Sequence, residues 1–297
     1  MNWLEKLSVN IFKSVFRGPL ALFSGKSPEV MLRRALDLLD DETVARLKSV
    51  VAKSLHPSGS FTDRAGQPDL YYTLFGTFLT EALELSELQG PIRQYVENTL
   101  CDDSPLRDHN MEGIHLYCAS ILVSKLSLNE NLRKELRRRI RKNLSRPSSK
   151  QPVYTAFVTL LACYYSGDTM GILRIRRQLQ NIARKEAQPS PVIAALMVLR
   201  HTFHGKTADL VRQVREYYDG AGGFRALKSA PVADLLSTAV VLYALRYVGE
   251  DLRLIKPDCL RFMDALYHEG GFAANALDPD TDVEYTFYGL LALGSLT

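Results

Sequence analysis

The 297-residue chain has few of the features that define several common protein classes. Its cysteines stand far apart with no CxxC pair, and they are Cys101, Cys118, Cys163 and Cys259. A zinc ribbon needs closely spaced cysteines, and disulfide-stabilised domains are usually dense in them, so we expect a reduced, intracellular protein of the cytoplasm. Uncharged apolar runs of about 18 residues are also missing, which argues against a membrane-spanning helix.

Charge and periodicity exclude further classes. The net charge of +4 is too small to favour a nucleic-acid partner. Lys13 and Arg17 interrupt the apolar residues near the N-terminus, so we expect no signal peptide. Alternating strand patterns do not stand out, whereas helical spacing recurs, so the predicted fold class is all-α.

Two segments indicate contact with a membrane or a partner. Residues 1–25 of the predicted N-terminal helical extension (1–55) are amphipathic, which fits a helix packed on the domain or an interfacial membrane helix. Residues 132–146 carry eight Lys or Arg and one acid. That segment is either a solvated outer helix or a surface for anionic lipid or an acidic partner.

From residue 56 onward the chain repeats. The anchor of each unit is the residue at a predicted helix start, and the anchors follow one another at intervals of 39 to 48 residues. They are Asp69, Glu112, Gln151, Ser190, Asp234 and Asp282. The helix after each anchor is apolar almost all round, and the other helix of a unit is amphipathic. This period and alternation predict two layers of stacked helical hairpins.

Three units share a longer motif. A turn with glycine and phenylalanine, such as Gly270-Gly271-Phe272, precedes each of Asp69, Asp234 and Asp282. Each aspartate is followed by two residues, a Tyr or Ser, a Thr and an apolar run. We expect Asp278 to Asp282 to form an acidic loop before the last helix.

Helical units of this period, with a Gly-Gly-Phe turn and an Asp-led inner helix, resemble the α/α-toroid superfamily. It includes the β subunits of protein prenyltransferases and the squalene and terpene cyclases. The resemblance implies a six-hairpin α/α barrel over 56–297 whose apolar funnel holds an isoprenoid. Ring closure would make the units of Asp234, Asp282 and Asp69 neighbours.

The prenyltransferase members hold zinc with an Asp-x-Cys pair and a histidine. The matching positions here are Asp234, Leu236 and Tyr285, so two ligands are replaced and we expect no zinc. Arg225 and Lys228 resemble that family's diphosphate-binding Arg-x-x-Lys, although a solvated loop would carry the same residues.

The cyclase members protonate an alkene from a clustered aspartate. An alkene is a very weak base, so the acid must stay protonated, which burial and nearby carboxylates promote. The resemblance implies Asp280 and Asp282 as the acid pair, supported by Asp234 and Asp69. Two other uses remain open: N-capping of the helices, and Mg²⁺ held by Asp278, Asp280 and Asp282.

Several further side chains could bind the substrate or belong to the core. Aromatic rings stabilise carbocations through their π faces, and the candidate lining residues are Tyr72, Tyr154, Tyr285 and Tyr288. His115 stands on an apolar helix, as a core residue or a general base. The predicted function is a zinc-free isoprenoid-handling enzyme most like a terpene cyclase. The alternative is a non-catalytic toroid that binds a lipid, a protein or a partner subunit.

Overall fold

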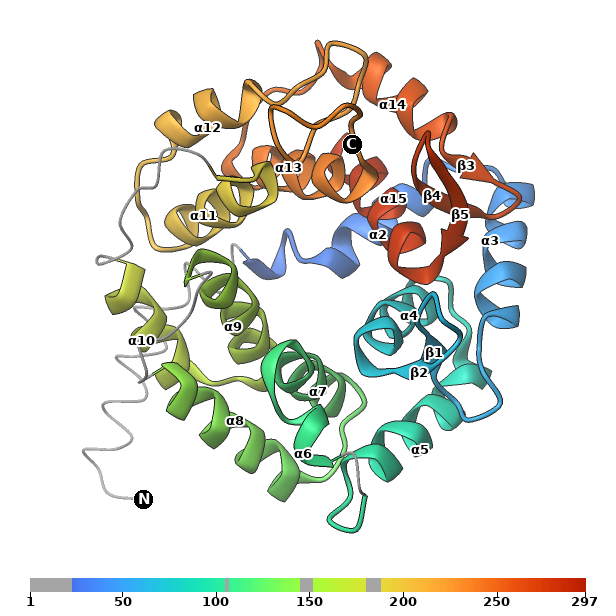
Figure 1. The fold of residues 1–297 in the computed structure, drawn as a ribbon, viewed down its shortest axis with the longest axis vertical. Coiled ribbons are helices and arrows are strands. Elements are labelled where there is room, and N and C mark those ends of the chain that lie inside the picture. Colours follow the sequence, from blue (N-terminus) through green and yellow to red (C-terminus); the bar gives the residue numbers. More distant parts are fainter. Residues whose placement is uncertain (1–22, 105–106, 145–151, 180–187) are drawn as a thin grey trace.

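The computed structural model describes residues 23–104, 107–144, 152–179 and 188–297, and it is mostly helical. The predicted fold class is therefore confirmed in its coarse form. The helices form two layers around a centre (Figure 1). Within the described residues, no helix is both long and apolar enough to cross a membrane. Of the amphipathic segment predicted at 1–25, residues 1–22 lie outside the described part of the chain.

The inner layer contains the helices that follow the repeat anchors. They are α4 (Leu70–Ala82), α7 (Gly113–Lys125), α9 (Pro152–Ser166), α11 (Ser190–Thr202), α13 (Leu235–Val248) and α15 (Val283–Ser295). Each begins at its anchor or directly after it, as the sequence predicts. Consecutive inner helices pack against each other, and α15 packs against α4, so the layer closes on itself (Figure 1).

The outer layer consists of helices with one apolar face. They are α3 (Asp41–Lys53), α5 (Gln89–Leu100), α8 (Glu130–Leu144), α10 (Thr169–Leu179), α12 (Ala208–Arg215) and α14 (Lys256–Asp264). Two short helices, η1 (Ser86–Leu88) and α6 (Arg107–Asn110), lie in the connections. The boundary predicted at residue 55 falls between α3 and α4, which pack against each other in the ring.

Short strands, which the sequence did not predict, precede two inner helices. They are β1 (Phe61–Thr62), β2 (Pro68–Asp69), β3 (Tyr267–His268), β4 (Gly271–Asn275) and β5 (Asp278–Asp282). The expectation of an acidic loop at 278–282 is therefore wrong, because β5 pairs antiparallel with β4. These strands are too short for an alternating pattern to develop.

The repeated motif has an architectural reason. In the first copy the Phe61 amide donates to Thr73 Oγ1 at 3.0 Å, and that hydroxyl donates to the Asp69 carbonyl at 2.6 Å. Thr238 and Thr286 make the same pair of bonds in their own copies. The Phe, Asp and Thr of the motif thus join the turn to the first turn of the inner helix.

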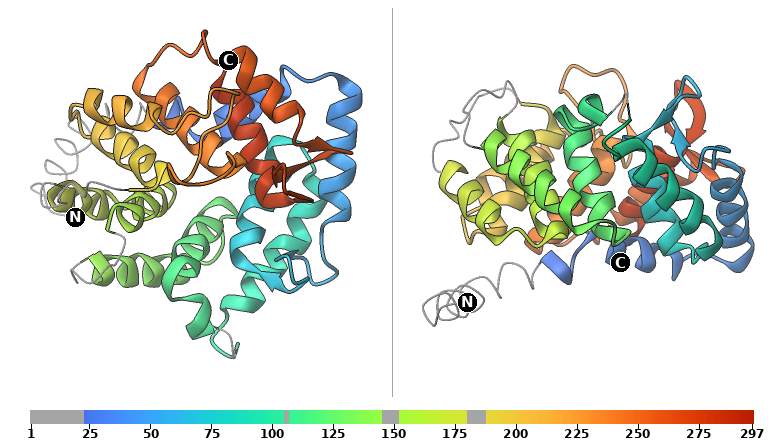
Figure 2. Two further views of the ribbon diagram at one scale, coloured as in Figure 1. Left: turned by 45° about the horizontal axis from the view of Figure 1, so that its top comes forward. Right: turned by 90° about the horizontal axis from the view of Figure 1, so that it is seen from below.

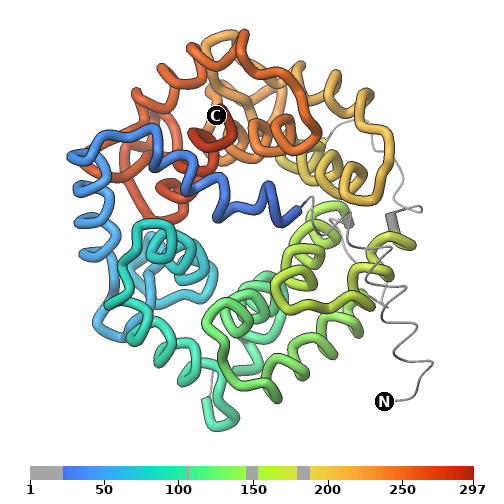
Figure 3. The backbone as a smooth tube through the Cα atoms, turned by 180° about the vertical axis from the view of Figure 1, so that it is seen from behind, coloured from blue at the N-terminus to red at the C-terminus, as the bar shows by residue number. Residues whose placement is uncertain are grey.

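Helix α2 (Pro28–Leu36) crosses the ring at one end (Figures 2 and 3). It packs against α15 and α4. Just before it, buried Phe23 lies 4.5 Å from the Tyr164 ring and 6.1 Å from the Tyr247 ring. These partners are near the C-terminal ends of α9 and α13, so residues 23–36 cover the end of the ring where the inner helices finish.

A buried ionic cluster joins this cover to the inner helices. Lys125, whose side chain is only 7% exposed, lies 2.7 Å from both Glu29 and Glu81. Its ammonium group is 4.3 Å from the centre of the Phe78 ring. Tyr165 donates its hydroxyl hydrogen to Glu29 at 2.9 Å. One lysine of α7 thereby ties α2 to α4.

The close approach of α2 to α15 requires a residue without a side chain at position 294, which can be tested. A Cβ atom there would lie 1.8 Å from the carbonyl oxygen of Met31, so Gly294→Ala forces α2 away. We expect it to lower the free energy of unfolding by about 2 kcal/mol, measured by urea denaturation. The control is Gly90→Ala in α5, where a Cβ meets nothing within 4 Å. That change should stabilise by up to about 1 kcal/mol, and equal losses in both variants would contradict the close approach.

Candidate functional site

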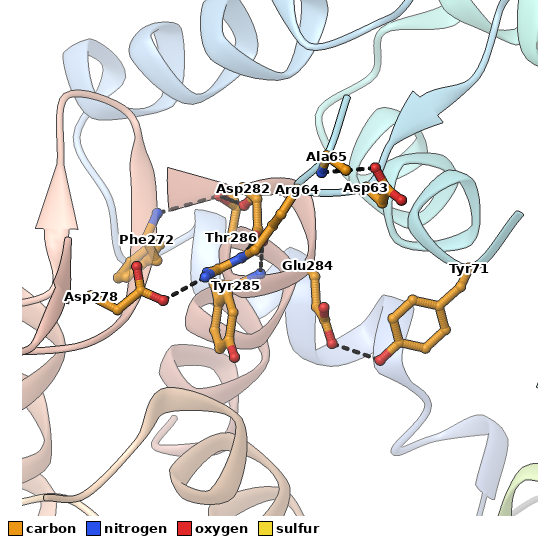
Figure 4. A network of polar contacts seen from close by, with 10 residues as sticks. All are labelled: Asp63, Arg64, Ala65, Tyr71, Phe272, Asp278, Asp282, Glu284, Tyr285 and Thr286. Carbon is orange, nitrogen blue, oxygen red and sulfur yellow. Dashed lines mark hydrogen bonds and ion pairs between the residues drawn. The ribbon is translucent and has the colours of Figure 1, made fainter. Parts of the chain in front are cut away.

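A buried carboxyl group lies at the other end of the ring, where the inner helices begin. Glu284, in the first turn of α15, is 8% exposed. Tyr71 of α4 donates its hydroxyl hydrogen to Glu284 Oε1 at 2.6 Å (Figure 4). The two side chains point toward each other from helices that are far apart in sequence and adjacent in the ring.

The tyrosines predicted as lining residues lie around this carboxyl group. Burial raises the pKa of Tyr154 and of Tyr285 to about 12, and the charge of Glu284 contributes to both shifts. The same two causes raise the pKa of Tyr72 and of Tyr288. Because Tyr154 comes from α9 and the others from α4 and α15, the cluster spans the inside of the ring.

These tyrosines remain in part accessible although their helices form the inner layer. Tyr154 is 38% exposed, and Tyr72, Tyr285 and Tyr288 are half-buried. Tyr288 packs on the Phe75 ring with the centroids 5.5 Å apart. We call Glu284 with Tyr71, Tyr72, Tyr154, Tyr285 and Tyr288 the glutamate–tyrosine cluster. It combines one acid with accessible aromatic surface.

The surroundings of Glu284 favour its neutral form. Burial raises the pKa of Glu284, and the negative charge of Asp282 raises it further. Hydrogen bonds from Tyr71 and Tyr72 and the positive charge of Arg64 act in the opposite direction, yet the net pKa is raised above 4.5. A carboxyl group in such an environment can donate a proton, as catalytic acids do.

The predicted acid pair and magnesium site have a different environment. Arg64 Nε donates to Asp282 Oδ2 at 2.9 Å, and the same guanidinium binds Asp278 (Figure 4). The hydrogen bond from Arg64 also lowers the pKa of Asp278. Asp280 is exposed. The position between Asp278 and Asp282, where a cation would bind, is thus taken by Arg64.

Across 23–104, 107–144, 152–179 and 188–297, no three or more His, Cys, Asp or Glu side chains are grouped to hold a metal ion.

The three repeated aspartates cap their helices. Asp69 accepts from the Tyr71 and Tyr72 amides at 2.7 and 2.9 Å. Asp234 and Asp282 accept in the same way from the third amide beyond each. The capping alternative is therefore what the structure shows for one oxygen of each carboxylate. The helices α13, α15 and α4 pack in that order, so the aspartates lie at the starts of neighbouring helices.

The caps differ in their second interactions. His115 Nε2 lies 3.1 Å from Asp69 Oδ2, and its ring is 5.4 Å from the His109 ring. Burial would raise the pKa of Asp69, but the hydrogen bonds from His115 and the backbone lower it. Burial raises the pKa of Asp234, and the hydrogen bonds from Ser237 and the Ala226 backbone offset this only in part. His115 is half-buried beside a carboxylate, so it is not a plain core residue.

The two residues of the predicted diphosphate-binding pair differ in their environment. Lys228 is ion-paired, whereas the buried Arg225 Nε has no hydrogen-bond partner among the described residues. Exposed Lys228 forms an ion pair with Glu216 and lies over the Tyr217 ring. The Arg225 carbonyl accepts from Ser190 Oγ at 2.7 Å, which ties the loop to the start of α11. These contacts join residues between the Ser190 and Asp234 anchors and do not involve Glu284.

Sequence reasoning placed Glu284 in the acidic loop without assigning it a role. Its signal was present in the repeats, since the matching positions in the other two copies are the uncharged Tyr71 and Leu236. An acid on an otherwise apolar inner helix must be buried or must face the ring interior. The recurring aspartates form the more conspicuous pattern, but they recur because each caps a helix.

Comparison with known proteins adds no family. A scan of protein-family models and a search of curated proteins each gave no match to this chain.

Proposed function

We propose that the two-layered ring is an α/α toroid and that it acts as a zinc-free, terpene cyclase-like enzyme on an isoprenoid. The observation that carries the proposal is the buried Glu284 among accessible tyrosines. An apolar chain would lie against the tyrosine rings, and Glu284 would protonate one of its double bonds. Asp280 is exposed and Asp282 is paired with Arg64, so we assign the role of the acid to Glu284 in their place.

The chemistry requires an acid that is protonated in an apolar site. Burial raises the pKa of Glu284, which is the direction that this requirement needs. Proton transfer to an alkene carbon leaves a carbocation on the substrate and a carboxylate on Glu284. The rings of the tyrosines stabilise the cation through their π faces, and the hydroxyl of Tyr71 stabilises the carboxylate by the hydrogen bond it already donates. Transfer of a proton from the cyclised cation back to the Glu284 carboxylate forms the neutral product and restores the acid.

Closure of one end of the ring supports this proposal. Residues 23–36 cover the end where the inner helices finish, so a ligand would enter from the end that holds the glutamate–tyrosine cluster. A site with one entrance limits the access of water to a cation, which would otherwise be quenched. The engagement of Lys228 with Glu216 favours proton-initiated chemistry over chemistry that begins with loss of diphosphate.

The direct test is incubation of the full chain with geranylgeranyl or farnesyl diphosphate, with and without Mg²⁺. The products are extracted and identified by mass spectrometry. Cyclised product that retains its diphosphate is expected, and it should form without Mg²⁺. Recovery of unchanged substrate from an incubation with proven binding would contradict catalysis.

A second candidate function is a non-catalytic ring that binds an isoprenoid or another lipid. The observation that favours it is that the caps account for the recurring aspartates without any chemistry. In that case Glu284 and Tyr71 would orient a polar end of the ligand. Saturable binding of geranylgeraniol by calorimetry, with no product by mass spectrometry, would select this function.

A further inference from the structure

The cations of the basic helix α8 differ in their charge compensation. Arg133 is paired to Glu130 and Arg139 to Glu135 of the same helix. Other cations of α8 line a surface hollow of about 510 Å³ beside α10. The residues that line this hollow are Lys134, Arg137, Arg138, Arg141, Lys142 and Arg174. We call it the basic hollow.

Positive charge in the basic hollow greatly exceeds negative charge. Of its cations, Arg141 binds buried Asp168, with 2.8 Å between Arg141 Nε and Asp168 Oδ2. Within the described residues, none of the remaining cations forms an ion pair with a carboxylate. Gathering like charges in one hollow costs electrostatic free energy, which an anionic ligand would recover.

Arg137 provides a second, independent indication. Its Nε atom is buried and has no hydrogen-bond partner in the part of the chain that the structure describes. A buried donor without a partner costs free energy unless a ligand or water satisfies it. Arg174 reaches the same hollow from α10, and its Nη1 donates to the Arg141 carbonyl at 3.3 Å. The hollow is thus built from two helices.

We propose that the basic hollow binds a compact ligand with two or more phosphate groups. Guanidinium groups bind phosphate oxygens through pairs of hydrogen bonds, so several arginines in one hollow fit clustered phosphates. The ligand is either a free polyphosphorylated compound or the phosphorylated headgroup of a membrane lipid. A concave site between two helices favours these over an extended polyanion. The inference is independent of the isoprenoid function, since the hollow lies on the outer layer.

The test measures binding of inositol trisphosphate to the full chain by calorimetry. Arg138→Gln with Arg174→Gln removes one exposed cation from each helix, and we expect it to weaken binding about tenfold or more. The matched control is Arg176→Gln with Arg177→Gln, which removes the same charge from exposed positions of α10 outside the lining. The control should bind within about twofold of the unchanged protein, because only nonspecific attraction is reduced.

Vesicles identify the source of the phosphates. Binding to phosphatidylcholine vesicles that contain phosphatidylinositol bisphosphate, and its displacement by inositol trisphosphate, would assign the hollow to a lipid headgroup. Binding of the soluble compound alone would assign it to a free ligand. Equal losses in the two double variants would overturn the proposal. So would competition by a random RNA oligonucleotide as effective as that of inositol trisphosphate, or the absence of binding to both probes.

Discussion

Glu284→Gln is expected to lower the rate of cyclised product formation about 100-fold or more, because general acids contribute about that much. The amide keeps the size of the side chain and can still accept the Tyr71 hydrogen bond, but it has no acidic proton. Binding of the isoprenoid should remain within about threefold, since the tyrosine surfaces are unchanged. Product is measured by mass spectrometry and binding by calorimetry.

The control is Asp282→Asn, which is nearly isosteric with the aspartate. Asparagine is as good an N-cap as aspartate, so α15 should keep its start and the enzyme most of its rate. A normal rate in Glu284→Gln with a large loss in Asp282→Asn would return the acid to the position that the sequence indicated. Loss of ligand binding in Glu284→Gln would support the non-catalytic function instead.

The effect of Glu284→Gln on the free energy of unfolding should also depend on pH. The folded-state pKa of Glu284 is raised, so the group contributes stability that is present below its unfolded value of 4.5 and is lost as pH rises through the folded pKa. Glu284→Gln, which stays neutral, should therefore be more stable than the unchanged protein at pH 8. The difference should shrink toward pH 4, as measured by thermal unfolding across the pH range. An unchanged difference at all pH values would refute the raised pKa.

Lys125→Met is expected to have the largest effect on stability, about 3 kcal/mol at pH 7. Methionine fills a similar volume, but it carries no charge. Glu29 of α2 and Glu81 of α4 therefore both lose their cationic partner. Breaking a buried ion pair by removing one member leaves an uncompensated charge. Urea unfolding followed by circular dichroism measures the loss.

The loss should depend on pH with a definite sign. Burial acts to raise the pKa of Glu29, but the charge and hydrogen bond of Lys125 outweigh it and lower the pKa. The ion pair therefore contributes stability above the unfolded value of 4.5, and this is lost as pH falls through the lowered folded pKa. The difference between Lys125→Met and the unchanged protein should thus be smaller at pH 3 than at pH 7.

A double variant separates charge from packing. Adding Glu29→Gln to Lys125→Met removes the stranded carboxylate, so part of the lost stability should return. Residues in direct contact commonly couple by about 0.5–3 kcal/mol in such a cycle. A cost that is the same at both pH values, with no recovery in the double variant, would mean that Lys125 acts through packing alone.

The starts of the inner helices could be predicted from the sequence because their signals are local. A preferred cap residue such as Asp69 or Asp282 followed by an apolar run defines a helix start within a few residues. The interval between anchors then indicates repeated hairpins. The short strands escaped prediction because the pairing of Phe61 with Asp69, or of Phe272 with Asp282, leaves too few residues for a periodic pattern.

The chemistry of the acids was decided by tertiary structure. Asp278, Asp282 and Glu284 are all acidic residues close together in the sequence. Only folding places Arg64 beside the first two and buries the third. Arg64 comes from 218 residues before Asp282, and Tyr71 from 213 residues before Glu284. The sequence by itself therefore determined where each inner helix begins, since capping acts over three or four residues. The direction in which the pKa of each carboxyl group shifts depends on desolvation and on charges brought together when α15 packs against α4, and no local pattern records that.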